Sequence, residues 1–240
     1  MAAIPNRVDC NSCSVRELCL PHGLSFDEVE QLERAVGARR RVKRGQELYH
    51  ARDAFNALYA IRLGSFKTRL STADGREQVT GFQMAGDLLG LDGIGAARYA
   101  SDAVALEDSE VCVVPFDQLE ELSREVGSLQ SHLHRMMSRE IVRDQGVMLL
   151  LGNMRAEERL ATFLLSLSER FRARGFSPSA FVLRMSRQEI GSYLGLKLET
   201  VSRVFSRFRE QGLVDVDQRE IRLRDEAALR RLVEACAGVS

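Results

Sequence analysis

The residues of this chain that are best suited to chemistry are its cysteines. The sequence contains five of them: Cys10, Cys13, Cys19, Cys112 and Cys236. The first three lie within ten residues of one another near the N-terminus, whereas the other two are far along the chain. In a reducing compartment, thiols crowded this closely are typical of metal binding or redox chemistry rather than of structural disulfides. Cys236 stands alone in a C-terminal helical turn, and we assign it no role.

Residue types and spacing leave the kind of thiol chemistry open. Cys10-x2-Cys13 is also the spacing of a structural zinc site, to which His22 could contribute a fourth ligand. A disulfide relay among the same thiols would give a redox switch that needs no metal. Both alternatives keep the cysteine segment as the sensing part of the molecule.

The composition is that of an ordinary soluble globular protein. Of the 240 residues, 45% are hydrophobic and 28% are charged. No apolar run approaches the roughly 18–20 residues that cross a bilayer, and residues 1–7 lack a secretory signal. We therefore expect a cytoplasmic protein without a membrane partner.

The charge is distributed unevenly along the chain. Residues 1–149 carry 18 Lys and Arg against 22 Asp and Glu, and residues 150–240 carry 16 against 12. This basic C-terminal part suits a polyanionic partner.

Residues 186–223 have the pattern of a winged helix-turn-helix. Ser186 can cap a helix over residues 187–194, Gly195 begins a tight turn, and a second helix covers residues 198–209. After Gly212, two alternating segments at 213–216 and 220–223 flank a short turn and predict the β-wing. An ordinary helical hairpin is the alternative interpretation.

The predicted second helix has one apolar face and one face that is suited to reading DNA. Arg can bind guanine with two hydrogen bonds, Glu can accept one from cytosine, and Ser can reach a base or a phosphate. The candidate DNA-binding residues are Glu199, Ser202, Arg203, Arg207 and Arg187. We expect double-stranded DNA as the partner of this segment.

The rest of the chain predicts an α+β fold with a sensory domain and a connecting helix. Short alternating segments broken by glycines fill residues 41–114, and Asp74-Gly75 is a strong hairpin signal, so we expect an antiparallel β-roll. A long helix follows from Asp117 to about Leu151. The predicted domains are a cysteine-rich segment (1–24), the β-roll (25–115), a dimerisation helix (116–151) and the winged helix-turn-helix (152–240).

The predicted long helix carries an apolar stripe with coiled-coil spacing. The first part of the stripe is Leu122, Val126, Leu129 and Leu133, and the second is Met137, Ile141, Asp144 and Met148. This pattern favours the seam of a symmetric homodimer over packing on the chain's own β-domain. Two Asp144 carboxylates that face each other across such a seam repel, which makes dimerisation adjustable.

In this order, the β-roll, long helix and winged helix resemble the CRP/FNR superfamily over essentially the whole chain, and the FNR-type anaerobic regulators, including the ANR proteins of pseudomonads, most closely. The resemblance is carried by Cys10-x2-Cys13-x5-Cys19, the remote Cys112, Gly86-Asp87-Leu88-Leu89-Gly90-Leu91-Asp92, and Leu194-Gly195-Leu196-x-x-Glu199-Thr200-Val201-Ser202-Arg203. The recognition-helix motif is shared by much of the superfamily, whereas the three-plus-one cysteine pattern singles out the FNR branch.

The resemblance implies an oxygen-sensing regulator of anaerobic metabolism genes. Cys10, Cys13, Cys19 and Cys112 correspond to four thiolate ligands of an oxygen-labile [4Fe–4S] cluster. The resemblance assigns base reading at an FNR-box-like palindrome with TTGAT half-sites to Glu199, Ser202 and Arg203. It assigns the dimer switch, in which the intact cluster favours the dimer, to Ile141 and Asp144. It also implies contact with RNA polymerase through surface loops of the β-domain.

Two other functional classes find little support in the residues. The cyclic-nucleotide binders of the superfamily share a phosphate-binding arginine, but this chain has Tyr99-Ala100-Ser101 in that stretch, with only Arg98 nearby. We therefore expect no cyclic nucleotide. An iron–sulfur enzyme or electron carrier is disfavoured because the chain has neither a Gly-x-Gly-x-x-Gly fingerprint nor a catalytic triad pattern. We expect no enzymatic activity.

Overall fold

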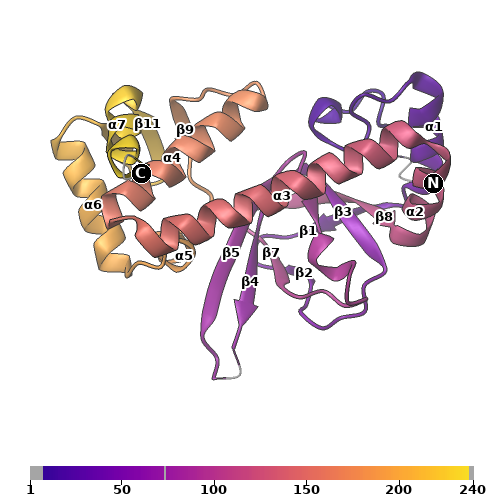
Figure 1. The fold of residues 1–240 in the computed structure, drawn as a ribbon, viewed down its shortest axis with the longest axis horizontal. Coiled ribbons are helices and arrows are strands. Elements are labelled where there is room, and N and C mark those ends of the chain that lie inside the picture. The colour runs from indigo at the N-terminus through magenta and orange to yellow at the C-terminus, as the bar shows by residue number, and fades with distance from the viewer. Residues whose placement is uncertain (1–7, 73, 238–240) are drawn as a thin grey trace, which may run out of the picture. The chain divides into compact units, whose positions relative to one another are not determined.

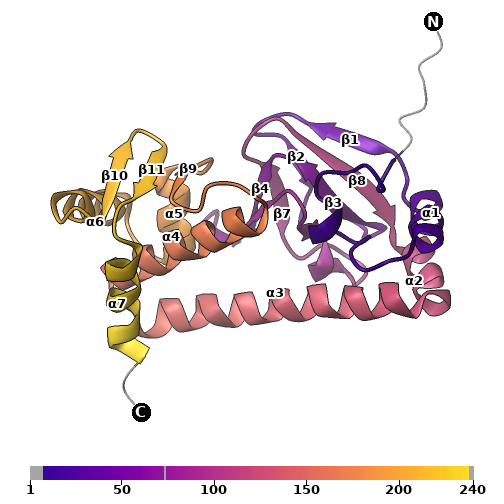
Figure 2. The same cartoon turned by 90° about the horizontal axis from the view of Figure 1, so that it is seen from above.

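The computed structural model describes residues 8–72 and 74–237. It divides the chain into two compact units, Met1–Ile141 and Val142–Ser240, which are described separately (Figures 1 and 2).

The first unit is built on two four-stranded antiparallel sheets. Their strand orders are β1-β8-β3-β6 and β2-β7-β4-β5. The strands are β1 (Arg39–Val42), β2 (Glu47–Tyr49), β3 (Ala57–Leu63), β4 (Ser65–Ser71), β5 (Glu77–Met84), β6 (Leu88–Leu89), β7 (Asp102–Ala105) and β8 (Ser109–Pro115). β4 and β5 pair as a hairpin, and Gly75 in their connection has φ of 81°, a value that favours glycine. The predicted β-roll is confirmed.

Short helices flank the roll. They are η1 (Arg16–Leu18), α1 (Phe26–Ala35), η2 (Leu91–Gly93) and α2 (Phe116–Glu125). α1 begins at a capping box, in which the Glu28 backbone N–H donates to Ser25 Oγ and the Ser25 N–H donates to the Glu28 carboxylate at 2.7 Å. α1 and α2 lie side by side in both views (Figures 1 and 2).

The long helix is present but begins later than the sequence pattern indicated. α3 runs over Gly127–Asn153, whereas residues 116–125 form the separate helix α2. The chain leaves helical geometry at Val126, which has φ of −109° and ψ of 90° and is buried. The apolar spacing continues through this position because Val126 contributes to the same core as Leu122 and Leu129, so the spacing alone did not reveal the break.

The core of the first unit joins the cysteine segment to the roll and to the start of α3. Buried side chains from all of these parts form one cluster, which includes Cys10, Leu20, Leu32, Ala60, Val114, Leu119, Leu129 and Leu133. A second cluster lies within the roll and contains Tyr49, Ile61, Phe66, Leu89 and Tyr99. The N-terminal segment is therefore part of the hydrophobic core rather than an appended tail.

The second unit is a winged helix-turn-helix. Its elements after α3 are α4 (Ala156–Ala173), β9 (Ala180–Val182), α5 (Arg187–Leu194), α6 (Leu198–Glu210), β10 (Val214–Asp217), β11 (Glu220–Leu223) and α7 (Glu226–Ala237). The three strands form one antiparallel sheet in the order β10-β11-β9. The predicted two-stranded wing is present, and β9 adds a third strand that the sequence did not indicate. In the part of the chain that the structure covers, no helix has the length and apolarity of a membrane span.

Candidate functional site

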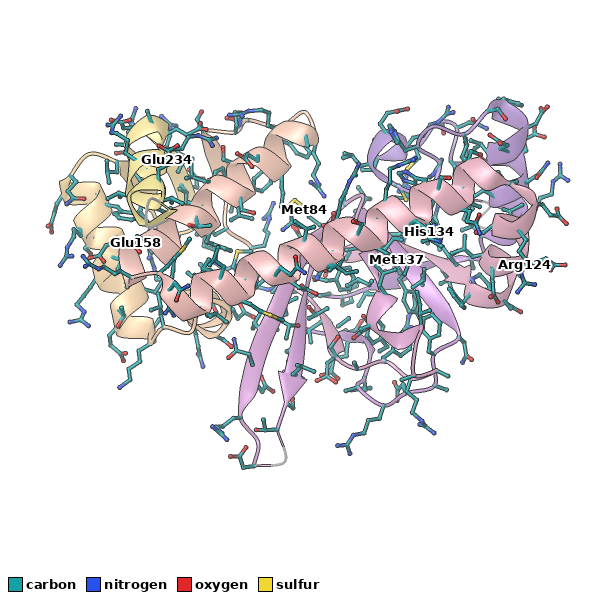
Figure 3. The ribbon with its side chains drawn as sticks, in the orientation of Figure 1. Met84, Arg124, His134, Met137, Glu158 and Glu234 are labelled. Atoms are coloured by element: carbon teal, nitrogen blue, oxygen red, sulfur yellow. The ribbon has the colours of Figure 1, made fainter. Side chains whose placement is uncertain are left out.

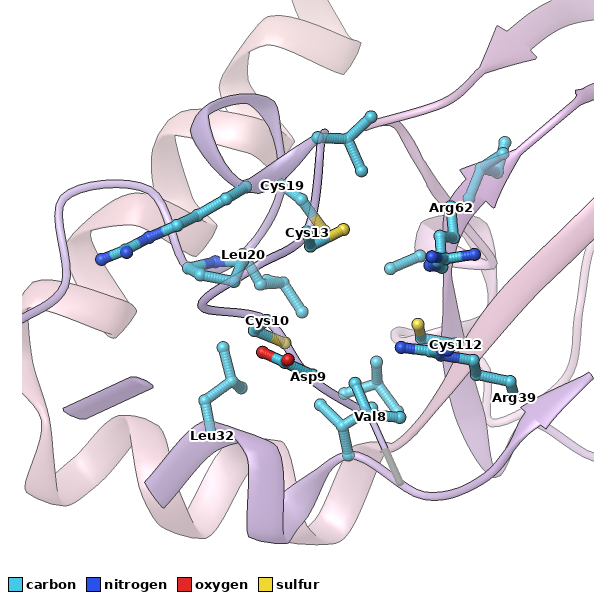
Figure 4. A pocket seen from close by; sticks show the side chains of 17 residues that line it. Val8, Asp9, Cys10, Cys13, Cys19, Leu20, Leu32, Arg39, Arg62 and Cys112 are labelled. Atoms are coloured by element: carbon cyan, nitrogen blue, oxygen red, sulfur yellow. The ribbon is translucent and has the colours of Figure 1, made fainter. Parts of the chain in front are cut away.

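Four cysteines line one small cavity in the first unit. Cys10, Cys13 and Cys19 come from the N-terminal segment, and Cys112 comes from β8 (Figure 4). All four are free thiols. The cavity has a volume of about 30 Å³, and most of its other lining residues are apolar: Val8, Val15, Leu20, Leu32, Val36, Ala60, Ile61 and Val114. The fold thus brings the remote Cys112 to the three clustered cysteines.

Backbone hydrogen bonds shape the N-terminal part of the cavity. The Cys13 N–H donates to the Cys10 carbonyl at 3.3 Å, and the Cys19 N–H donates to the Arg16 carbonyl at 3.3 Å. The Glu33 carboxylate of α1 accepts from the Cys10 N–H at 2.7 Å and from the Asn11 N–H at 3.2 Å. These bonds hold a segment that has little regular secondary structure against α1.

β8 supplies the fourth cysteine from the middle of a sheet. Cys112 lies opposite Arg39 of β1 and opposite Ala60 of β3 in the strand register. Residues that pair across antiparallel strands point to the same face of a sheet. Arg39, Cys112 and Ala60 therefore present one row of side chains to the cavity.

Burial raises the pKa of three of the thiols, Cys10, Cys19 and Cys112. Burial raises the pKa of Cys10 to about 12, and the neighbouring Cys112 adds to this increase. Burial also raises the pKa of Cys19. The other three cysteines raise this pKa further, whereas a backbone hydrogen bond lowers it by less than burial raises it. The pKa of Cys112 is raised by burial, while Arg39 and Arg62 act in the opposite direction. Despite the two arginines the pKa of each of these three thiols is raised, and a bound cationic group would favour their thiolates.

Two arginines contribute buried polar atoms to this mostly apolar cavity. Arg39 and Arg62 both line it, and the Nε atom of each is buried with no hydrogen-bond partner among the described residues. Among those residues, no three of Cys, His, Asp and Glu come together as a site for a single metal ion. The sequence singled out neither arginine, because their proximity to Cys112 depends on strand register.

A histidine that the sequence left without a role connects the cysteine segment to α3. His132 is 1% exposed, and its Nε2 lies 3.1 Å from the Cys19 carbonyl oxygen. Since a carbonyl can only accept, Nε2 carries the proton of this hydrogen bond. The neighbouring His134 is exposed on the same helix (Figure 3). The N-terminal segment and α3 are thereby joined by a hydrogen bond as well as by apolar packing.

The helix-turn-helix of the second unit is formed by local signals. The Glu189 N–H donates to Ser186 Oγ at 3.2 Å and the Ser186 N–H donates to the Glu189 carboxylate at 2.6 Å, so α5 begins at a capping box. Gly195 ends α5 with φ of 63°, which favours glycine. α6 follows after the short turn at residues 195–197, and its buried face consists of Val201, Val204, Phe205 and Phe208.

The candidate DNA-binding residues lie on the opposite face of α6 or at the start of α5. Glu199, Arg203 and Arg207 are exposed, and Ser202 is half-buried. Arg203 donates to Thr200 Oγ1 at 3.4 Å. Arg207 is paired with Glu157 of α4, and the Arg187 guanidinium lies 4.1 Å from the centre of the Phe205 ring. Three of the five side chains therefore already have a partner within the protein.

The two candidate dimer-switch residues lie on α3. Ile141 has 57% of its surface exposed, and Val142, Met148 and Leu149 are exposed apolar neighbours on the same helix. Asp144 is also exposed, and the pKa of its carboxyl is raised by partial desolvation against a smaller opposing effect of Arg143. The distal part of α3 thus presents apolar side chains beside a carboxylate.

Tyrosines fill the interior of the β-roll. The rings of Tyr49 and Tyr99 stack with their centres 3.9 Å apart, and Tyr59 stacks on Tyr49 at 5.7 Å. The Tyr99 hydroxyl donates to the Ala57 carbonyl at 2.8 Å. Arg98 is outside this core, and its guanidinium donates to the Arg52 carbonyl at 2.7 Å.

Comparison with known proteins agrees with this architecture. Residues 39–125 match the cyclic nucleotide-binding domain, and residues 158–232 match the Crp-like helix-turn-helix domain. The chain is 48% identical to the transcriptional regulatory protein btr of Bordetella pertussis, over 97% of each chain. It is 44% identical to the fumarate and nitrate reduction regulatory protein of Escherichia coli K12, over 94% of this chain and 90% of that protein.

A solved structure extends the likeness to three dimensions. FixK2 from Bradyrhizobium japonicum is 31% identical and has a TM-score of 0.76, and the match covers 82% of this chain and 96% of that one. The resemblance inferred from the motifs is confirmed. The chain belongs to the CRP/FNR family of DNA-binding transcription regulators and is related to its FNR-type members.

Proposed function

We propose that this protein is an oxygen-responsive transcription regulator that binds a [4Fe–4S] cluster through Cys10, Cys13, Cys19 and Cys112. The observation that carries the proposal is the single cavity lined by all four thiols. Four cysteines supply one thiolate for each iron of such a cluster, and the two partnerless Nε atoms offer N–H donors to its sulfurs. The donor set therefore suits the group.

The bound cluster supplies a centre whose oxidation by oxygen removes the link between its ligands. The chain's own residues convert that loss into a structural signal. Through the bound cluster Cys112 would tie the N-terminal segment to β8, and His132 holds the same segment to α3 through the Cys19 carbonyl. Losing the cluster would release this tie between the Cys10–Cys19 segment and β8. Cluster loss thus moves a segment that packs on α3.

The regulator acts as a homodimer on palindromic, FNR-box-like DNA. The exposed apolar residues around Ile141 form the seam, and the Asp144 carboxylate opposes association when the cluster is lost. Glu199, Ser202 and Arg203 read bases in the major groove, while Arg187 and Arg207 contact phosphates. RNA polymerase is the further partner, contacted through the β-roll surface, and anaerobic metabolism genes are the targets.

This assignment divides the chain by role. Residues 1–24 bind the cluster, residues 25–115 form the sensory roll, residues 116–151 carry the dimer seam and residues 152–240 read DNA. The roll itself takes no cyclic nucleotide, because stacked tyrosines occupy its interior and Arg98 is bound to a backbone carbonyl outside it. The chain has a regulatory role in the cytoplasm and no catalytic one.

The second candidate is a regulator of the same family whose thiols bind zinc or form disulfides. Zinc needs its ligands gathered around one ion at about 2.3 Å from each sulfur. No three of the described Cys, His, Asp and Glu residues are gathered around one point, but one cavity is lined by four thiols, which either kind of centre would use. Metal and sulfide analysis therefore decides between the two candidates.

The test is anaerobic purification followed by iron and sulfide analysis, a visible spectrum and DNA binding before and after air. We expect about four irons per chain, a broad absorption band that bleaches in air, and loss of dimer and DNA binding with the bleaching. Stoichiometric zinc, or DNA binding that is independent of any metal, would remove the proposed signal and support the second candidate.

A further inference from the structure

Arg39 and Arg62, which both line the cysteine cavity, each have a buried Nε donor without a hydrogen-bond partner in the described structure. Buried N–H groups are almost always hydrogen-bonded, since an unpaired one has given up its hydrogen bonds to water without replacement. The Arg39 side chain is 17% exposed and the Arg62 side chain 31%, yet both Nε atoms are fully covered and have no hydrogen-bond partner in the described structure. Two such atoms at one cavity call for an acceptor that the protein itself does not provide.

Glu110 holds both arginines without satisfying these atoms. Arg62 Nη1 donates to Glu110 Oε1 at 3.0 Å, which leaves the Arg62 Nε unused. Arg39 Nε is 3.8 Å from the same oxygen, too far for a hydrogen bond. Glu110 is only 12% exposed and also pairs with Arg41 at 3.5 Å. The Glu110 carboxylate therefore holds both guanidinium groups but leaves the Nε–H donors of Arg39 and Arg62 without an acceptor.

Strand register brings both arginines to Cys112. Arg39 pairs directly with Cys112 across β1 and β8. The pairing of β3 with β8 shifts between Ile61 and Leu63, and this irregularity leaves Arg62 without an opposite residue. An extra residue of this kind redirects a side chain, often beside a functional site. Arg39 and Arg62 lie on the Cys112 side of the cavity (Figure 4).

We propose that the Arg39 and Arg62 guanidinium groups donate N–H···S hydrogen bonds to the sulfur atoms around Cys112 and tune the stability of the centre bound there. The inference rests on the proposed cluster. A centre held by four thiolates is anionic, and its potential depends on nearby charge and on hydrogen bonds to its sulfurs. Two positive charges and two donors beside it favour the more electron-rich state and slow its oxidation. Both arginines are positioning residues for the centre, not ligands.

The experiment compares four forms of the full-length protein purified without oxygen: wild type, Arg39→Gln, Arg62→Gln and Arg41→Gln. Arg41 is the matched control because it shares the Glu110 partner and the β1 strand, but its side chain is 83% exposed and does not line the cavity. Iron and sulfide content, midpoint potential and the rate of bleaching in air are measured for each. Circular dichroism checks that each variant is folded.

In Arg39→Gln and Arg62→Gln we expect bleaching that is about three- to tenfold faster and a more negative midpoint potential, with the Arg41→Gln values unchanged. Arg39→Lys keeps the charge and should recover part of the potential. A folded Arg39→Gln or Arg62→Gln chain that loses iron while Arg41→Gln keeps it also supports the inference.

Glutamine variants that hold the cluster and keep the wild-type potential and bleaching rate would overturn the inference, as would an equal change in Arg41→Gln. If the wild type itself contains no iron or sulfide, the cluster proposal fails as well.

Discussion

The DNA-reading surface and the cysteine cavity are positioned by different kinds of structure. The helix-turn-helix is made by one continuous stretch, in which a capping box, a glycine turn and an apolar face act within residues 186–208. The cavity needs a loop, two helices and two neighbours of β8 to come together around Cys112. Both regions hold buried donors without a hydrogen-bond partner among the described residues, Arg187 Nη1 in the first and the Nε atoms of Arg39 and Arg62 in the second, but only the second gathers four free thiols.

This difference indicates where a signal can act. A locally formed surface changes little when a distant ligand is lost, because its own hydrogen bonds and core remain. A cavity whose parts are held partly by a bound group loses contacts directly when that group leaves. We therefore expect oxygen to alter the first unit and the association of chains, and to leave the recognition helix folded.

The largest expected effect is the loss of the cluster on Cys112→Ser, which removes the only ligand supplied by the sheet. We expect iron content to fall at least about tenfold, because a serine hydroxyl does not replace a soft thiolate, while the DNA-binding unit stays folded by circular dichroism. Val113→Thr is the matched control, since Val113 points to the other face of β8. Full iron retention in Cys112→Ser would show that Cys112 is not a ligand of the cluster.

The next effect concerns the reading surface alone. Arg203→Ala should weaken binding to the cognate palindrome by about 1–3 kcal/mol and relax specificity at one base position. Iron content and bleaching should not change, because Arg203 lies on α6 in the other unit. Binding is measured by fluorescence anisotropy on sites that vary at each half-site position. Arg209→Ala, exposed near the C-terminal end of the same helix, is the control for a general loss of charge.

The opposite outcomes would also be informative. Equal weakening on all sequences would make Arg203 a phosphate contact, and unchanged binding would remove it from the interface.

The contrast between the two sites also explains what the sequence could predict. Ser186, Glu189 and Gly195 act over a few residues, so the helix-turn-helix and its exposed face were predicted from local pattern. The β-roll followed from alternation and glycine turns. The partnership of Arg39 and Arg62 with Cys112 was not predicted, because it depends on register between strands far apart in the chain and on an irregularity at Arg62.

Two further differences have the same origin. His132 looked like one of several scattered histidines, and only the packing of the N-terminal segment on α3 gives it a partner. The break at Val126 was hidden because the residue keeps its place in the apolar pattern while its backbone leaves the helix. Tertiary contacts, rather than local preference, decide each case.

A smaller effect is expected where the cysteine segment meets α3. His132→Ala removes the hydrogen bond to the Cys19 carbonyl, but that carbonyl also accepts from the His22 N–H at 3.0 Å. The carbonyl is not left without a partner, so the lost hydrogen bond should contribute only about 0.5–1.5 kcal/mol, to which the cavity left by truncating this buried side chain adds a further loss of stability. Faster air bleaching should accompany this loss.

Chemical denaturation of the metal-free protein measures this change in stability. His134→Ala, on the exposed side of the same helix, should leave both quantities unchanged (Figure 3). Equal stability and equal bleaching rates in the two variants would show that the His132 hydrogen bond does not couple α3 to the cysteine segment.

An effect of similar size is expected at Asp144, and its magnitude depends on pH. Partial desolvation raises the pKa of this carboxyl in the native chain, so its ionised form is disfavoured there and becomes more so when a second Asp144 approaches in a dimer. A group with a raised native pKa binds protons more readily in that state, and association should therefore strengthen as the pH falls toward the pKa.

In the cluster-free protein, the dimer fraction measured by analytical ultracentrifugation should increase from pH 7.5 to pH about 5.5. Asp144→Ala should dimerise more strongly at pH 7.5, by about 1 kcal/mol, and lose most of this pH dependence. Asp117→Asn, an exposed carboxylate on α2, provides the control for net charge. A dimer fraction that falls with decreasing pH, or that is unchanged in Asp144→Ala, would place the carboxylate outside the seam.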